Sequence, residues 1–146
     1  MYGISQNQNT NDYIIVLQDD YCENCGNQYT DMRNKWCKPC QINNIKGNFV
    51  NWTSGNKEID NFIQEMQLKI NSRYDVIFEW IPYNQFYNIK EIEKSDSVVV
   101  YSAIWMNGPL DYNFSKSKQE RIPNNKVTLK YFYNSQNFIS EFLNMV

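Results

Sequence analysis

Four cysteines are the residues of this sequence whose spacing points most directly to chemistry. They form two C-x2-C pairs separated by eleven residues: Cys22, Cys25, Cys37 and Cys40. Each pair can turn tightly enough to hold one cation, and a loop of about a dozen residues lets the second pair complete a tetrahedron. Thiolates favour zinc among the common metals. Four thiolates leave no open coordination position, so the spacing predicts a structural Zn2+ site.

The alternative for the cysteines is a pair of disulfides or four unrelated thiols. The regular spacing and the lack of a secretory leader favour the metal. Gly26, directly after Cys25, suits the positive φ that such a tight turn often needs. The sequence contains no histidine, which excludes histidine acid–base catalysis, Ser-His and Cys-His nucleophile pairs, and His-ligated metals.

Basic and aromatic side chains accompany the cysteines and suggest a second chemistry. They are Tyr29, Arg33, Lys35, Trp36, Lys38 and Lys46. Small zinc modules can bind single-stranded nucleic acid by stacking and by cations. Glu23 and Asp31 dilute the positive charge, so we expect a solvated face around a small aromatic core and no nucleic-acid partner.

Composition limits the size and the class of the protein. The 146 residues suit one domain or two very small ones, and a 42% hydrophobic share with 16% aromatics is typical of a globular chain. The net charge is -2, so no global positive field attracts nucleic acid or anionic lipid. No apolar run approaches the length of a membrane span. We therefore expect no membrane partner and a soluble protein of the cytoplasm, with the nucleus as the alternative.

Apolar patterning predicts an α+β fold. The strand-like segments are a hairpin in residues 1–18, an extended stretch at 76–82, and strands at 86–92, 98–105 and 126–133. A helix is expected from Asn56 to Ile70 with Asn56 as its N-cap. A second helix is expected to start near Asn134 or Ser135 and to continue to the last residue, Val146.

Two segments show little periodicity. Residues 19–46 hold all four cysteines, so their order is expected to come from a cross-link. Residues 106–125 form a polar excursion between two strands.

The order of strands in the second half resembles the opening of a protein-kinase small lobe. The residues that carry this resemblance are Ile89–Ile92, Val100–Trp105 and Val127–Lys130. Upstream segments look like the leader of an expanded fungal protein-kinase family of the tyrosine-kinase-like group. These segments are Trp36–Cys40, Phe49–Asn56, Ile59–Gln64 and Glu79–Tyr83.

The resemblance spans most of residues 20–146 and implies four units along the chain. They are a hairpin resembling small-lobe strands four and five (1–18), a four-cysteine zinc knuckle (19–46), a helical linker (47–82) and a degenerate, truncated small lobe (83–146). The small lobe implied is a twisted antiparallel sheet with one helix.

The resemblance also assigns residues to a nucleotide site. The ATP lysine is Lys130, the three loop glycines fall on Glu93, Ser95 and Val98, the adenine-lining alanine falls on Thr128, and the gatekeeper and first hinge positions fall on Leu17 and Gln18. The glycine losses and the added carboxylates oppose ATP binding. From the residue alone, the alternative for Lys130 is an ordinary exposed strand lysine.

In this sequence the glutamate that pairs with the family's lysine is not at its usual position. The pairing glutamate falls on Met145, while Glu141 lies one helical turn earlier. The family's catalytic aspartate and magnesium ligands belong to the large lobe, which these 146 residues do not include.

The resemblance therefore implies a catalytically inactive, pseudokinase-like fragment that acts as an interaction module. We expect a protein partner, with another kinase among the candidates. One alternative is a partial chain of an active ATP-dependent kinase that phosphorylates Ser/Thr or Tyr. Another is a zinc-dependent RNA-binding or adaptor module.

The position of the N-terminal hairpin separates two accounts of the fragment. Ile14–Leu17 is apolar on both faces, which favours pairing with the C-terminal sheet and a reassembled small lobe. The long intervening segment equally allows the hairpin to stay apart, as expected for a truncated copy.

Overall fold

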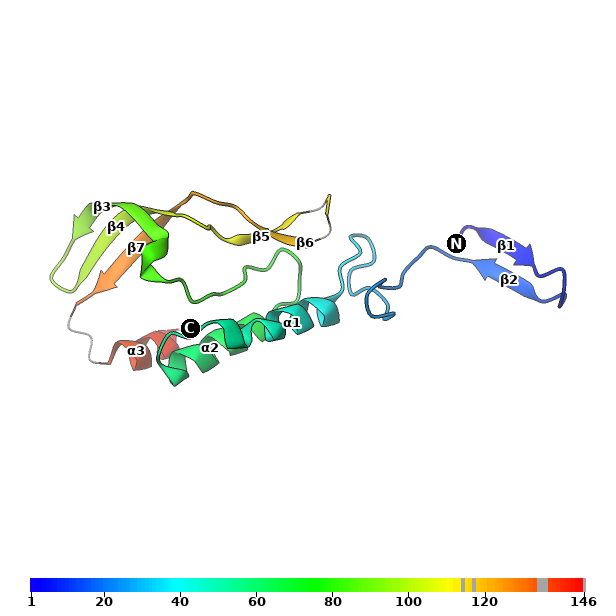
Figure 1. Cartoon of the computed structure of the whole chain (residues 1–146), viewed down its shortest axis with the longest axis horizontal. Helices are drawn as coiled ribbons and strands as arrows, with labels where there is room; N and C mark the ends of the chain where they lie inside the picture. Colours follow the sequence, from blue (N-terminus) through cyan, green and yellow to red (C-terminus); the bar gives the residue numbers. More distant parts are fainter. Residues whose placement is uncertain (114, 117, 134–136, 146) are drawn as a thin grey trace.

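The computed structural model describes residues 1–113, 115–116, 118–133 and 137–145, and combines small antiparallel sheets with three helices (Figure 1). The strands are β1 Gly3–Gln6, β2 Tyr13–Val16, β3 Phe86–Lys94, β4 Val98–Trp105, β5 Leu110–Asn113, β6 Lys118–Arg121 and β7 Asn125–Phe132. The helices are α1 Lys38–Gly47, α2 Lys57–Leu68 and α3 Phe138–Met145, with 3-10 turns η1 Phe49–Asn51 and η2 Tyr83–Gln85. The predicted α+β class is confirmed at this level.

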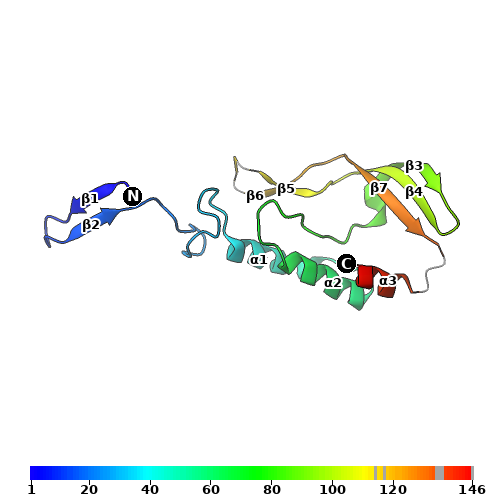
Figure 2. The ribbon, with the colours of Figure 1, turned by 180° about the vertical axis from the view of Figure 1, so that it is seen from behind.

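The N-terminal hairpin forms, but it does not join the C-terminal sheet. β1 and β2 pair antiparallel with Gly3 opposite Val16, and they make a two-stranded sheet of their own. Figures 1 and 2 place this hairpin at the opposite end of the molecule from β7. The expected pairing with the C-terminal sheet is therefore wrong for this structure. The connection through residues 17–20 has no regular structure and leads away from the sheet.

Helix α1 was not predicted from the sequence. Its residues show no apolar stripe, and of its side chains only Ile45 is buried. Local signals start the helix instead, because Cys37 occupies the N-cap and Pro39 lies in the first turn, where a missing amide hydrogen costs nothing. A helix with so few apolar contacts leaves little periodicity to detect.

Helix α2 agrees with the prediction in position and in its cap. The Asn56 side chain accepts hydrogen bonds from the amides of Glu58 and Ile59, which satisfies two otherwise unpaired donors. On the buried face, the Phe62 ring packs edge-on against Phe78 at 5.6 Å and against Phe142 at 5.4 Å between centroids. The helix thus joins the 76–82 segment to α3.

The predicted C-terminal strands form a three-stranded antiparallel sheet in the order β3-β4-β7. Its covered face includes Val99, Ala103 and Trp105, which are buried. Helix α3 follows β7, and the rings of Phe132 and Phe138 lie 5.3 Å apart. The two residues predicted to cap this helix, Asn134 and Ser135, lie outside the described residues.

The polar segment 106–125 contains a hairpin that the sequence did not reveal. β5 and β6 pair antiparallel with Leu110 opposite Arg121. The Arg121 guanidinium donates two hydrogen bonds to the Glu79 carboxylate, at 2.7 and 2.6 Å, and a third to the carbonyl oxygen of Gly108 at 2.9 Å. These contacts hold the hairpin against the 76–82 segment. They stabilise a hairpin whose sequence lacks the apolar alternation typical of paired strands.

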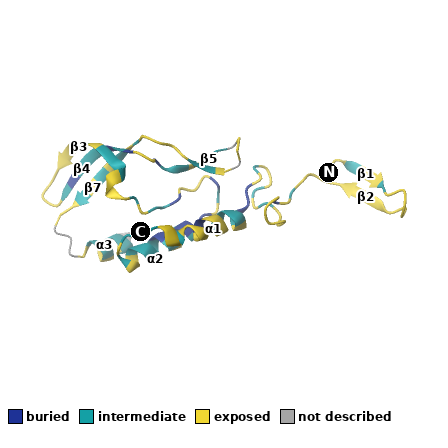
Figure 3. Cartoon of the chain, viewed as in Figure 1, coloured by how far each residue is buried: buried dark blue, intermediate teal, exposed yellow. Residues whose placement is uncertain are grey.

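The cysteine segment shares a core with the rest of the chain. Its buried members are Trp36, Ile45, Ile70, Ile77 and Tyr112. Figure 3 shows this buried layer along α1 and α2, whereas the N-terminal hairpin is mostly exposed. None of the described helices has the length and apolar character needed to cross a bilayer.

Candidate metal centre

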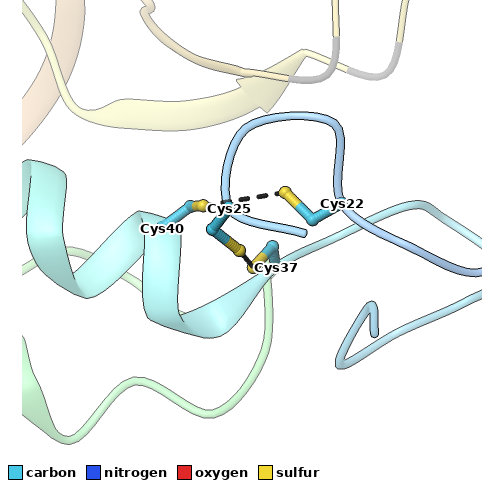
Figure 4. A group of neighbouring side chains, drawn as sticks. All are labelled: Cys22, Cys25, Cys37 and Cys40. Atoms are coloured by element: carbon cyan, nitrogen blue, oxygen red, sulfur yellow. Dashed lines mark hydrogen bonds between the residues drawn. The ribbon is translucent and has the colours of Figure 1, made fainter. Parts of the chain in front are cut away.

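The four cysteines that the sequence singled out meet at one point. Their Sγ atoms all lie within 4.8 Å of one another (Figure 4). Within the described residues, this cluster of cysteines is compact enough to hold a metal ion. The closest contacts join the two pairs: Cys22 Sγ lies 3.6 Å from Cys40 Sγ, and Cys25 Sγ lies 3.5 Å from Cys37 Sγ.

These separations distinguish a metal site from disulfides. A disulfide requires about 2.05 Å between its sulfur atoms. Tetrahedral zinc with Zn–S bonds of about 2.3 Å places its sulfur ligands roughly 3.8 Å apart. The observed 3.5 and 3.6 Å are close to the second value and far from the first. The residues therefore fit a four-thiolate metal centre.

A tight turn positions the first pair. The Cys22 amide donates to the carbonyl oxygen of Asn27 at 2.7 Å, and the Gly26 amide donates back to the Cys22 carbonyl oxygen at 2.8 Å. Gly26 has φ +72°, which glycine adopts without the steric cost that a side chain would impose. The expected role of Gly26 is confirmed, and the turn directs Cys22 and Cys25 toward the same point (Figure 4).

The start of α1 positions the second pair. Asp31 and Trp36 exchange two backbone hydrogen bonds, at 3.1 and 3.0 Å, which close the turn before the helix. Cys37 follows as the N-cap and Cys40 lies in the first turn, so both side chains extend from the start of the helix. The positive end of the helix dipole favours thiolates at this position.

The surroundings shift the pKa values of Cys22, Cys37 and Cys40 in different directions. A backbone amide hydrogen bond from Cys25 is the main reason that the pKa of Cys22 falls to about 7. Burial raises the pKa of Cys37 and of Cys40 above the usual thiol value. A metal that binds all four must displace these held protons, so its affinity falls as the solution becomes more acidic.

The β5–β6 hairpin lies above the cysteine cluster. A cleft of about 600 Å³ separates them, lined on the hairpin side by Tyr112, Lys116, Lys118 and Gln119. Lys116 donates to Glu120 at 2.8 Å. No apolar alternation predicts β6, because its four residues are all polar.

Two of the basic residues beside the cysteines contact polar side chains of the same chain. Lys35 Nζ lies 3.8 Å from the Asp19 carboxylate, and Lys38 Nζ donates to the Asn71 side chain at 2.6 Å.

The residues assigned to a nucleotide site are only partly brought together. Strand pairing places Glu93, Val100 and Lys130 in one row across the sheet. Thr128 and Val98 project from the same face of the sheet as Lys130, because alternate residues of a strand share a face. Lys130 and Thr128 are exposed.

Leu17 and Gln18 do not join this group. They follow β2, and both are exposed at the far end of the molecule (Figure 3). Within the described part of the chain, neither Glu93 nor Glu141 forms an ion pair with Lys130. The side chain of Met145 lies outside the described residues.

Comparison of the chain with protein-family models, with curated proteins and with solved structures finds no match in any of the three. The functional argument therefore depends on the residues and their geometry.

Proposed function

We propose that this chain is a non-catalytic interaction module, stabilised by structural zinc and related to a protein-kinase small lobe. The observation that carries the proposal is the convergence of four Sγ atoms within 4.8 Å. A site of four thiolates offers a metal no vacant position for water or substrate, so its role is to hold residues 21–47 in place.

The hydrogen bonds of the turn between β3 and β4 support the proposal that the chain does not bind the phosphates of a nucleotide. The Ser95 amide donates to the Val98 carbonyl oxygen at 2.8 Å, and the Val98 amide donates to the Ser95 hydroxyl oxygen at 3.3 Å. A phosphate-binding loop needs such amides free to donate to phosphate oxygens. Two amides of this loop are already used within the turn, and Glu93 adds a carboxylate beside it.

The sheet supplies the binding surface of the proposed module. In the order β3-β4-β7, one face of the sheet and the outer edge of β7 lie at the surface, next to Lys130. A kinase-like lobe that lacks phosphate contacts retains this surface for a protein partner.

Zinc content tests the metal part of the proposal. Native mass spectrometry of the 146-residue protein is expected to show one zinc per chain, lost in Cys37→Ser and retained in Lys38→Gln, which changes the neighbouring exposed side chain. Protein with four reduced thiols, no metal and full amide protection over residues 21–47 would contradict it.

A phosphotransfer assay tests the non-catalytic part. The purified chain with labelled ATP and magnesium is expected to transfer no phosphate to itself or to a generic protein acceptor. Reproducible transfer that disappears in Lys130→Ala would instead support an active kinase.

A further inference from the structure

The N-terminal hairpin exposes an apolar surface that its own chain does not cover. Tyr13, Ile15 and Leu17 are 79%, 62% and 60% exposed, and Ile4 on the neighbouring strand is 75% exposed. A two-stranded hairpin is at best marginally stable by itself in water. Apolar residues lie on both faces of the hairpin, which is typical of strands that other parts of a protein cover on both faces.

The hydrogen-bond pattern identifies a free edge on β2. The Asn7 amide donates to the Asp12 carbonyl oxygen at 2.9 Å, which makes these residues a hydrogen-bonded pair of the antiparallel ladder. Bonded and non-bonded pairs alternate along such a ladder. With Ser5 opposite Ile14 and Ile4 opposite Ile15, the backbone amides of Tyr13 and Ile15 therefore point away from β1.

Strand β7 has a free edge of the same kind. The Tyr133 amide donates to the Ser97 carbonyl oxygen at 3.1 Å, so the same alternation directs the odd-numbered residues of β7 toward β4. The amides of Thr128 and Lys130 consequently point to the outer side of the sheet. An open edge of this length invites pairing with another strand.

Charge favours β7 over the other edge strand as the place where the hairpin binds. Residues 1–20 carry three carboxylates, Asp12, Asp19 and Asp20, and no lysine or arginine. β7 carries Lys126 and Lys130 and no acidic residue. β3, at the opposite edge, has balanced charges and two irregularities in its register.

We propose that the β2 edge of one copy pairs with the β7 edge of a second copy, and that the exchange is reciprocal. The hairpin and β7 lie at opposite ends of the elongated chain (Figures 1 and 2). Two copies arranged antiparallel about a two-fold axis bring each hairpin to the sheet of the other, which closes the assembly as a dimer. This inference rests on the proposed interaction role and names its partner as a second copy of the chain.

Proline substitutions at two opposed residues test the proposal. Ile15→Pro removes an amide from the free edge of β2, while Ile4→Pro removes the matching amide from the free edge of β1. In sedimentation equilibrium we expect a dimer for the unmodified protein and for Ile4→Pro. Ile15→Pro is expected to raise the dimer dissociation constant by about tenfold or more, as expected for the loss of one or more strand hydrogen bonds.

Cross-linking locates the contact. A carboxyl-to-amine cross-linker applied to a mixture of ¹⁴N- and ¹⁵N-labelled protein is expected to join Asp12, Asp19 or Asp20 of one isotope to Lys126 or Lys130 of the other. A monomer at 100 µM or equal dissociation constants for the two proline variants would overturn the proposal, as would cross-links formed only within one isotope. Zinc content measured on the same samples separates this failure from failure of the metal site.

Discussion

At the residue scale, Gly108 is the glycine with the least room for a side chain. It has φ +66°, and a Cβ there would lie 1.6 Å from the carbonyl oxygen of Ile122. Backbone atoms would have to move, and the Gly108 carbonyl oxygen would lose its place beside the Arg121 guanidinium. We expect Gly108→Ala to lower the free energy of unfolding by about 3 kcal/mol in urea titration.

Gly47→Ala is the matched control for that substitution. Gly47 is the last residue of α1, and a Cβ there meets no atom within 4 Å. Alanine is the better helix former by up to about 1 kcal/mol, so this variant is expected to be neutral or slightly more stable. Equal losses in both variants would contradict the steric argument at Gly108.

The cysteine site is the part of the molecule that the sequence predicted residue by residue. Spacing alone identified Cys22, Cys25, Cys37 and Cys40, because two short pairs and one loop leave few ways to place four sulfur atoms. The contribution of Trp36 to the core could not be predicted from the sequence in the same way. Its burial depends on Tyr112, far along the chain, and no local pattern encodes that contact.

At the element scale, the start of α2 depends on Asp60. Its carboxylate accepts hydrogen bonds from the Thr53 hydroxyl at 2.6 Å and from the Ser54 amide at 2.8 Å, and a further one from the Ser54 hydroxyl. These donors, the Ser54 hydroxyl first, hold the pKa of Asp60 below its usual value of 3.8. Folding therefore favours the charged form of Asp60. The contribution of this carboxylate to the free energy of unfolding is complete above about pH 4 and is lost as the pH falls through the lowered pKa.

We expect Asp60→Asn to be less stable than the unmodified protein at pH 7, and the difference in unfolding free energy to shrink as the pH is lowered through 4 toward 2. Ser54→Ala removes a donor while leaving the carboxylate, so an NMR titration should show the Asp60 pKa moving back toward 3.8. If the difference in unfolding free energy between Asp60→Asn and the unmodified protein did not change with pH, these hydrogen bonds would not require the charged Asp60 carboxylate.

Elements with an apolar period were predictable, and those without one were not. α2 and the strands of the main sheet alternate or repeat clearly, and their positions agree with the prediction within a few residues. α1 and the β5–β6 hairpin have no such pattern. They are ordered by contacts that are distant in sequence, chiefly the cysteine cluster and the Arg121–Glu79 pair.

At the scale of the whole molecule, the sequence did not determine where the N-terminal hairpin lies. The apolar run Ile14–Leu17 indicates that a partner strand is needed, but it does not say which one. Pairing within the chain and pairing between two chains satisfy the same backbone groups. In the structure the hairpin remains separate from the main sheet, so the apolar pattern of the hairpin does not by itself select the partner strand.

If the cysteine cluster binds zinc as proposed, removal of the metal should separate the molecule into a part that unfolds and a part that persists. Trp36 directly precedes Cys37 and Ile45 lies in α1, and both belong to the core that contains Ile70, Ile77 and Tyr112. A structural zinc site contributes on the order of 10 kcal/mol, which the few apolar residues of this segment cannot replace. The β3-β4-β7 ladder contains buried Val99 and Ala103 and no cysteine, so it should keep its own hydrogen bonds.

Hydrogen exchange with and without a chelator measures this division. Chelation is expected to abolish amide protection over residues 21–47 and to weaken it in the β5–β6 hairpin, whose Tyr112 loses its packing partners. Protection in residues 98–105 and 125–132 should remain, and the buried Trp36 should become exposed, with a red shift of its fluorescence. Cys37→Ser should show the same pattern before chelator is added and no change after it. Uniform loss of protection across the sheet as well would mean that the metal holds the whole fold, not one end of it.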